Sequence, residues 1–199
     1  FLNGVLVHHH GLAAPHYGGS KQHGGALAHQ LQAVPVSGGK ETVVLAGGAV
    51  VEMPWIGEAK ALLNSYLGGE ASGSAVTDIL FGDVNPSGKL AETYPFSLED
   101  TPCYNNFPGH TATVEYREGL YIGYRYYDTA KKNVLFPFGF GLSYTSFELF
   151  DKTVMEADDR IIVSVKVRNV GSAAGKEVIE VYYGAPQGEL GKAAKSLAA

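Results

Sequence analysis

Apolar and polar positions follow different periods in the two halves of the chain, and the first half mixes strand and helix patterns. Residues 42–46 (TVVLA) form a continuous apolar run with β-branched side chains, which is typical of a strand buried on both faces of a parallel sheet. Helical spacing of apolar residues predicts helices at 56–69 and 72–83, each with glycine near its end. Residues 90–94 and 120–128 have extended character, and the second segment, with four tyrosines, predicts a strand. This order indicates α/β layers, with helices covering a sheet.

The period changes to two past residue 150. In the run 160–170, Ile161, Val163, Val165 and Val167 alternate with Ile162, Ser164, Lys166 and Arg168. A second alternating run covers 176–184, and the glycine-containing residues 169–177 connect the two runs. We therefore predict that these two runs form an antiparallel sheet with one solvent-facing side, as in a β-sandwich.

Residues 1–40 differ from the rest of the chain, because they show little helical or strand periodicity and are rich in small and polar residues. Six of the seven histidines lie in this segment, three of them adjacent as His8, His9 and His10. Neutral imidazole is a common metal ligand. Adjacent histidines on an irregular segment point in different directions, however, and no carboxylate lies nearby. We favour a poorly ordered leader over a metal site.

The segment 134–150 (VLFPFGFGLSYTSFELF) lies where the two patterns meet, and it contains five phenylalanines. Between Phe136 and Tyr144 the only polar side-chain groups are the hydroxyls of Ser143 and Tyr144. Aromatic residues interleaved with glycine suit a chain that bends tightly while it buries its rings. We interpret this segment as a packed joint between two folded units, with a sugar or base platform as the alternative.

Composition and charge narrow the function classes. The chain is 45% hydrophobic and 18% charged, as in ordinary globular proteins, and its net charge of −5 argues against a nucleic-acid partner. No apolar run approaches the ~20 residues of a membrane span. The opening residues lack the features of a signal peptide, and Cys103 stands alone. We expect a cytoplasmic location, with secretion of a longer parent as the alternative.

Several motifs resemble glycoside hydrolase family 3 enzymes, in their order and at suitable spacing. They are DILFGDVNPSGKLAETYP (78–95), EYREGLYIGYRYYD (115–128), PFGFGLSYTSF (137–147) and NVGSAAGKEVIEVYY (169–183). The resemblance runs from Glu41 to Ala199. Over this range the chain is most similar to bacterial β-glucosidases. It implies an α/β-sandwich domain at 41–144 after the leader 1–40. An incomplete all-β domain of the immunoglobulin or fibronectin type III kind follows at 145–199.

The resemblance also implies what chemistry the chain lacks. Hydrolysis of a terminal β-D-glucosyl residue with retention needs a nucleophilic and an acid/base carboxyl group about 5–5.5 Å apart. In the family, an aspartate nucleophile comes from a preceding TIM barrel, and a glutamate acid/base lies upstream of the strand that matches 42–46. No residue of this chain matches either motif. We therefore expect no catalytic residue, no cofactor, no metal and no turnover by this chain alone.

Six residues are candidates for a position near the substrate or at the interface with the barrel. These are Glu70, Asp83, Glu115, Glu118, Tyr124 and Arg125. The first two lie at helix ends, where α/β sheets place ligand sites. The alternative for the four acidic residues is a set of solvated turn and loop charges. For Tyr124 it is a buried tyrosine. For Arg125 it is an arginine that pairs with Asp128 or Glu118 or stacks on a tyrosine.

The predicted partners follow from the same resemblance. They are a β-glucoside or oligosaccharide that binds the parent enzyme, and the TIM barrel that precedes these domains in the family. The truncated β-sheet leaves an unpaired edge, which predicts self-association. The alternative function is a stand-alone carbohydrate-binding or protein-interaction module without catalysis.

Overall fold

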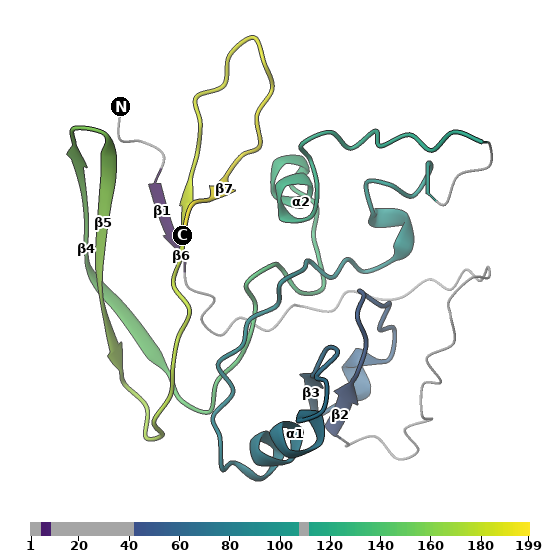
Figure 1. Ribbon diagram of the computed structural model, residues 1–199, viewed down its shortest axis with the longest axis vertical. Coiled ribbons are helices and arrows are strands. Elements are labelled where there is room, and N and C mark those ends of the chain that lie inside the picture. The colour runs from purple at the N-terminus through teal and green to yellow at the C-terminus, as the bar shows by residue number, and fades with distance from the viewer. Residues whose placement is uncertain (1–4, 9–41, 108–111) are drawn as a thin grey trace.

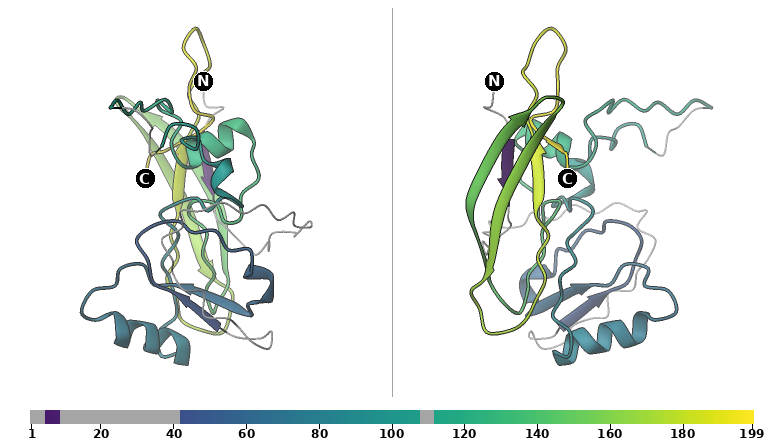
Figure 2. Two further views of the ribbon diagram at one scale, coloured as in Figure 1. Left: turned by 90° about the vertical axis from the view of Figure 1, so that its right-hand side faces the viewer. Right: turned by 60° about the vertical axis from the view of Figure 1, so that its left-hand side comes forward.

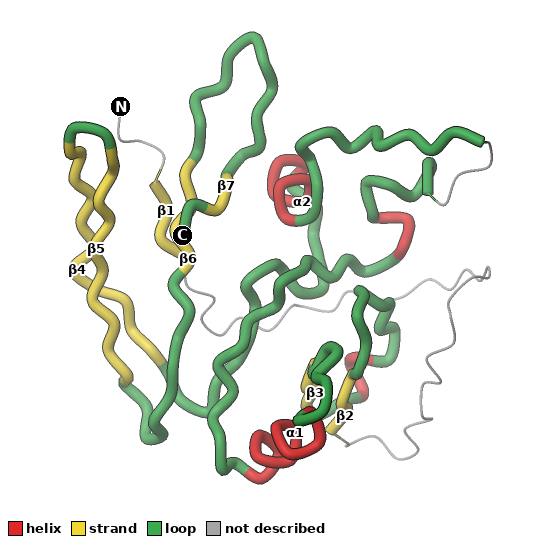
Figure 3. The backbone as a smooth tube through the Cα atoms, viewed as in Figure 1, coloured by secondary structure: helices red, strands yellow, loops and turns green. Residues whose placement is uncertain are grey.

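The computed structural model describes residues 5–8, 42–107 and 112–199 of the chain (Figure 1). Its strands are β1 (Val5–His8), β2 (Thr42–Leu45), β3 (Ala61–Asn64), β4 (Phe147–Ala157), β5 (Arg160–Asn169), β6 (Glu180–Tyr183) and β7 (Ser196–Leu197), and its α-helices are α1 (Ser72–Phe81) and α2 (Tyr124–Ala130). Figure 1 shows α1, β2 and β3 together at one end, with β4 and β5 along the opposite side. Loops make up most of the remaining described chain (Figure 3). None of the described helices is long and apolar enough to cross a membrane.

The strand predicted at 42–46 forms as β2 and pairs in parallel with β3. The helix predicted at 56–69 is wrong, because this segment contains only a 3₁₀ turn (Ile56–Glu58) followed by β3. A short apolar run fits both the helical and the strand period. Tertiary contacts therefore decide whether such a run forms a helix or a strand. Here Leu62 and Ile56 pack against the core, and the Ser65 amide extends the pairing by donating to the Leu45 carbonyl oxygen at 2.8 Å.

Helix α1 confirms the helix predicted at 72–83, although it ends two residues earlier. Gly82 ends it in the left-handed conformation (φ +84°), with its amide donating to the Ile79 carbonyl oxygen. Val76 and Ile79 are half-buried, whereas Leu80 and Phe81 are exposed. The apolar face predicted for this helix is therefore only partly covered.

The strand predicted at 120–128 is wrong, because Tyr124 to Ala130 form helix α2. Gly123 (φ +56°, ψ −135°) turns the chain into this helix with a conformation that favours glycine. Since the segment is not extended, its tyrosines do not alternate between two faces. Only Tyr127 is fully buried among them.

The loop predicted at 97–119 is confirmed within the described residues, where it contains one short 3₁₀ turn, Leu98–Asp100. Figures 1 and 2 show this loop projecting away from the rest of the chain. Its two limbs are joined by the side-chain amide of Asn106, which donates to the Glu115 carbonyl oxygen at 2.7 Å. We call the described residues 96–107 and 112–122 the arm.

The β half contains two separate sheets, of which β4 and β5 form one as a long antiparallel hairpin. The strand predicted at 160–170 is confirmed as β5, but its predicted pairing with 176–184 is wrong. Strand β6 pairs instead with β1 and β7. The connection between β5 and β6 contacts the α/β half, where the Asn85 side-chain amide donates to the Ala174 carbonyl oxygen at 2.9 Å.

The two sheets lie side by side in Figure 2, and the chain passes from one to the other between β5 and β6. The presence of two sheets joined by a crossing connection agrees with the predicted β-sandwich. The α/β half likewise has the predicted strand and helix layers, but with a two-stranded sheet.

The aromatic segment 136–144, which we call the elbow, is packed against an extended stretch of the α/β half. The Leu90 amide donates a hydrogen bond of 2.9 Å to the Phe140 carbonyl oxygen, and the Tyr94 amide donates to the Phe136 carbonyl oxygen at 2.8 Å. The rings of Phe136 and Phe140 stack with centroids 5.1 Å apart. These contacts support the interpretation of this segment as a packed joint.

The core of the α/β half is built around the elbow. Met53, Tyr94 and Leu135 are almost completely buried, and Phe136 packs against them. The Tyr94 hydroxyl accepts a hydrogen bond of 2.9 Å from the Asn64 side chain on β3. One cluster therefore joins β3, the extended stretch and the elbow.

The elbow also contacts β6 at Gly139, where the side chain of Glu180 fills the space that a side chain would need. Gly139 has φ +79°, and a Cβ atom added there would lie 2.2 Å from Glu180 Oε1. Glu180 is buried, and its carboxylate accepts a hydrogen bond of 2.7 Å from the Tyr182 hydroxyl. The positive φ favours glycine at position 139, and a larger residue would also have to displace the buried, hydrogen-bonded carboxylate of Glu180.

A buried ion pair is the second connection across the elbow. Lys89 Nζ lies 2.8 Å from Glu177 Oε1, and the two side chains are only 9% and 4% exposed. Lys89 Nζ also donates to the Gly141 carbonyl oxygen at 2.7 Å. The lysine thus joins the turn before Leu90, the elbow and the segment that leads into β6.

We expect Gly139→Ala to destabilise the chain by at least about 2 kcal/mol, because the added methyl group collides with Glu180 and the residue must keep a positive φ. Chemical denaturation of the full chain measures this loss. Gly188→Ala is the matched control, since no atom lies within 4 Å of its added Cβ. Equal effects of the two substitutions would contradict the steric account of the elbow.

We expect Lys89→Ala to cost about 3–5 kcal/mol of unfolding free energy, because it leaves the Glu177 carboxylate buried without its lysine. The control is Lys166→Ala, which removes an ion pair with Asp151 whose side chains are 68% and 59% exposed. That change should cost less than about 1 kcal/mol. If both variants unfold at the same denaturant concentration, the ion pair does not hold the elbow.

Candidate functional site

Helix α2 is fixed against the end of the β half, which makes it a rigid support for a site. The Thr129 hydroxyl accepts a hydrogen bond of 2.9 Å from the Ala194 amide, and the Tyr124 hydroxyl accepts one of 2.8 Å from the Leu197 amide. Lys195 lies 3.1 Å from the Asp128 carboxylate. The backbone amides of Ala194 and Leu197 and the side chain of Lys195 thus anchor the helix.

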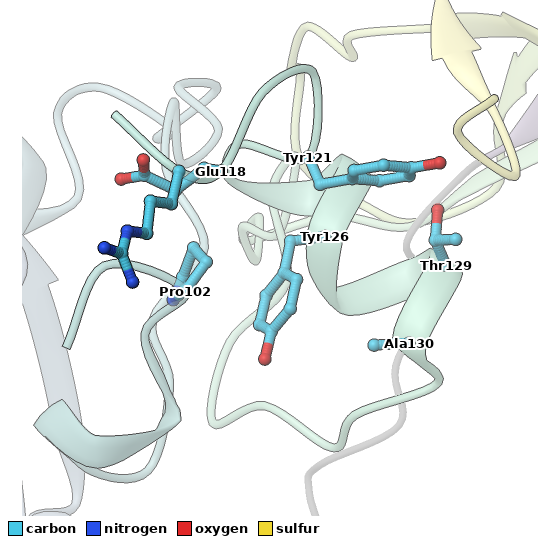
Figure 4. A pocket seen from close by; sticks show the side chains of 7 residues that line it. Pro102, Glu118, Tyr121, Tyr126, Thr129 and Ala130 are labelled. Carbon is cyan, nitrogen blue, oxygen red and sulfur yellow. The ribbon is translucent and has the colours of Figure 1, made fainter. Parts of the chain in front are cut away.

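A pocket of about 340 Å³ lies between α2 and the arm (Figure 4). It is lined by Pro102, Arg117, Glu118, Tyr121, Tyr126, Thr129 and Ala130. In Figure 4, Tyr121 and Tyr126 lie between Glu118 on one side and Thr129 on the other. Two phenol rings beside a carboxylate, a guanidinium and a hydroxyl can bind a polar ligand or a polar protein side chain.

The charges around this pocket are only partly compensated. Glu118 Oε2 is buried and has no hydrogen-bond partner among the described residues. Arg117 does not supply one, because its guanidinium pairs with the exposed carboxylate of Glu115. Beside the pocket, Lys132 Nζ lies 5.6 Å from the centre of the Tyr126 ring and 3.4 Å from Asp100. The carboxylate of Glu118 therefore has an unused capacity to accept a hydrogen bond.

Burial perturbs three tyrosines near the core and α2. Removal from water raises the pKa of Tyr127 to about 12, with a further contribution from the charge of Asp100. Burial likewise raises the pKa of Tyr94 to about 12. Burial and the hydrogen bond to Glu180 raise the pKa of Tyr182. These hydroxyls stay protonated near neutral pH, and those of Tyr94 and Tyr182 form hydrogen bonds with Asn64 and Glu180.

The six predicted site residues do not form one cluster. Glu70 and Asp83 are exposed and flank the two ends of α1, which lies far from α2 in Figure 1. Glu115 is exposed on the arm, and only Glu118 lines the pocket.

Tyr124 and Arg125 are the first two residues of α2, but neither lines the pocket. The Arg125 guanidinium lies 5.8 Å from the centre of the Tyr124 ring, and its Nε is buried without a partner among the described residues. The ring contact agrees with the alternative considered for this arginine, stacking on a tyrosine.

Sequence analysis did not select Tyr121, Tyr126 and Thr129 for this site. Residues 126, 129 and 130 share one face of a helix at i, i+3 and i+4, so a helical assignment of 124–130 would have grouped them. The strand assignment placed neighbouring residues on opposite faces and hid this grouping.

The pocket does not have the groups of a glycosidase active site, because Glu118 is the one carboxylate among its lining residues. Retaining hydrolysis needs two carboxyl groups about 5–5.5 Å apart. Nor do the described residues include a group of three or more His, Cys, Asp or Glu side chains that could hold a metal ion. The adjacent histidines of the leader have no described side chains, so the metal alternative there lies outside the described residues.

Comparison with known families assigns the chain to a class. The sequence model of the "Glycosyl hydrolase family 3 C-terminal domain" matches residues 24–144, which is more than half of the 199 residues. The chain therefore belongs to glycosyl hydrolase family 3. The match ends at Tyr144, within the elbow as defined above, and it begins inside the segment that sequence analysis assigned to a leader.

Individual relatives carry the same family assignment. Thermostable β-glucosidase B of Acetivibrio thermocellus is 58% identical over 144 residues, which cover 70% of this chain and 19% of the relative. A β-glucosidase of Kluyveromyces marxianus is 42% identical over 168 residues, covering 84% of this chain and 20% of the relative. The chain thus spans about a fifth of the length of these relatives.

Solved structures agree with the sequence matches. The family 3 β-glucosidase of Bifidobacterium adolescentis superposes with a TM-score of 0.76 at 41% identity, over 79% of this chain and 24% of that one. β-Glucosidase 3B of Thermotoga neapolitana in complex with glucose superposes with a TM-score of 0.76 at 39% identity. The superposition covers 79% of this chain and 23% of that one. The fold described above is therefore that of the C-terminal region of these enzymes.

Because burial raises the pKa of Tyr127, we expect the chain to lose stability in strong base. Because the pKa of Tyr127 is about 12 in the folded chain and 10.0 is its ordinary value, the unfolded chain releases this proton first as pH rises. The stabilisation is complete below pH 10 and declines between pH 10 and 12. Denaturation of the wild type and Tyr127→Phe at a series of pH values measures this slope. An equally steep slope in the variant would contradict the assignment.

Proposed function

We propose that this chain is the C-terminal portion of a β-glucosidase that hydrolyses terminal β-D-glucosyl residues with retention. Its role is to support the active site rather than to supply the reacting carboxyl groups. The observation that carries this proposal is the elbow, which fixes an α/β layer to a β-sheet unit, in a chain that superposes on a family 3 β-glucosidase with a TM-score of 0.76. The described pocket, with its single carboxylate, supports a non-catalytic role for this part of the enzyme.

The proposed position is against the TIM barrel that carries the nucleophile, where the chain helps to shape the sugar site. The small core of the described part supports this position. In the described part, few apolar side chains are fully buried: Met53, Tyr94, Tyr127, Leu135, Tyr182 and Ala193. Such a small core calls for a further folded partner.

Within this proposal the six candidate residues keep their predicted roles. Glu70 and Asp83 are exposed polar residues for the barrel interface. Glu118 and Glu115 belong to the arm beside the pocket, and Tyr124 and Arg125 support that region from α2. The substrate is a β-glucoside or oligosaccharide bound by the parent enzyme, and the proposed chemistry uses carboxyl groups without a cofactor.

Two further proposals concern location and association. Cys103 is half-buried and free, which supports a reducing compartment such as the cytoplasm. The two-stranded sheet β4–β5 exposes Met155, Ile161 and Val167, each by more than 40%. An open sheet edge beside exposed apolar residues favours self-association of the chain when no other domain covers it.

The pocket favours a second candidate function, a stand-alone carbohydrate-binding module. Tyr121 and Tyr126 beside a hydroxyl and a carboxylate have the chemistry of a sugar site. This function requires measurable affinity of the chain for a glucoside without any catalytic domain.

We expect the chain alone to show no turnover of an aryl β-glucoside, because its described pocket holds a single carboxylate. Activity should appear in a chimera of thermostable β-glucosidase B in which the matching stretch is replaced by that of this chain, since the two are 58% identical there. The unmodified relative is the control. Turnover by the chain alone, or a folded chimera without activity, would contradict the proposed function.

A further inference from the structure

The arm carries a concentration of apolar side chains that the rest of the chain does not cover. The large hydrophobic residues exposed on it are Phe96, Leu98, Tyr104, Phe107, Val114, Tyr116, Leu120 and Ile122. Tyr116 is 89% exposed and Phe107 is 69% exposed. Isolated exposed apolar residues are common on proteins, but many on one projecting segment indicate an interaction surface.

The arm nevertheless has a defined backbone. At its base, the Leu98 amide donates to the Glu52 carboxylate at 2.5 Å, and Lys132 contacts Asp100 at 3.4 Å. Further out, the hydrogen bond from Asn106 to the Glu115 carbonyl oxygen joins the two limbs. An arm that is held at its base and across its limbs presents its side chains with little loss of entropy on binding.

The adjoining pocket points independently to a partner. Arg117, Glu118 and Tyr121 of the arm line it, and Glu118 Oε2 is buried without a hydrogen-bond partner among the described residues. A buried carboxylate oxygen without a donor is costly. A hydrogen-bond donor or a cation from a partner would remove this cost.

The composition of this surface fits a protein partner. Tyrosine, phenylalanine and arginine are enriched at protein interfaces and dominate their energetics. Tyr116, Phe107 and Tyr104 supply the aromatic groups, and the exposed ion pair of Arg117 and Glu115 supplies a polar rim.

We propose that the arm and its pocket are the surface by which the chain docks on the catalytic domain of a family 3 β-glucosidase. A basic or amide side chain of that domain donates a hydrogen bond to Glu118. This inference rests on the proposed function. The occupant follows from chain length, since about four fifths of each curated relative lies outside the part that this chain matches.

The test uses the chimera of thermostable β-glucosidase B together with the full 199-residue chain. Hydrogen exchange should show that amides at 104–107 and 112–117 are protected more strongly in the chimera than in the chain alone. This readout does not require activity, so it separates the docking surface from the proposed function. Equal exchange of these amides in both proteins would overturn the docking surface.

Substitutions then identify the contacts. In the chimera, Phe107→Ser with Tyr116→Ser should lower the activity, or the fraction of molecules that are folded and docked, by about tenfold or more. In the chain alone, the same double substitution should leave the stability unchanged. The matched control is Met155→Ser with Ile161→Ser, at positions on the β4–β5 sheet that are each 54% exposed and lie outside the arm. Arm variants that behave like this control would contradict the proposal.

Glu118→Gln tests whether a side chain of the catalytic domain donates a hydrogen bond to Glu118. The control is Glu99→Gln, on the exposed part of the arm. We expect only the first change to weaken docking, and to do so more strongly at low salt, where charge pairing is less screened. Equal effects of the two changes would overturn the role of Glu118. Sedimentation of the chain alone gives the remaining outcome: a dimer that Phe107→Ser abolishes would show that a second copy, rather than the catalytic domain, occupies the arm.

Discussion

The contact between the elbow and the extended stretch before Pro95 holds the described structure together. Backbone hydrogen bonds from Leu90 and Tyr94 reach the elbow, and Glu180 of β6 occupies the space beside Gly139. The buried Lys89–Glu177 pair lies on the same line of contact. Because these interactions lie between the α/β half and the β half, they set how the two halves are placed. Neither half has enough buried apolar surface to define its position by itself.

Sequence patterns predicted those parts of the fold that local chemistry determines. The runs at 42–46 and 160–170 form strands as predicted. The glycine and proline residues of 97–119 correctly indicated a loop. The errors fell on segments whose state depends on distant partners. Residues 61–64 became a strand because β2 pairs with them, and the β5–β6 connection contacts Asn85 instead of forming a hairpin. The same limit applies to the site, since the pocket joins the arm to a helix that the sequence had suggested was a strand.

The molecule has the organisation of a supporting unit. Its polar interior groups, Glu180 and Lys89 among them, are used to connect segments, and two of the tyrosines with raised pKa values are buried hydrogen-bonding groups. Glu118, whose carboxylate is buried without a partner among the described residues, belongs to the arm, where apolar side chains are exposed. Stability is thus concentrated at the elbow and binding capacity at the arm. This separation suits a domain that positions another one.

The central claim, that the elbow makes the two halves one cooperative unit, is tested most directly by equilibrium denaturation followed with two local probes. Fluorescence of Trp55, the single tryptophan, reports the core of the α/β half, and hydrogen exchange of the β5 amides reports the β half. The account predicts that both signals are lost at the same denaturant concentration. Loss of one signal while the other persists would show that the halves unfold independently and would contradict the claim.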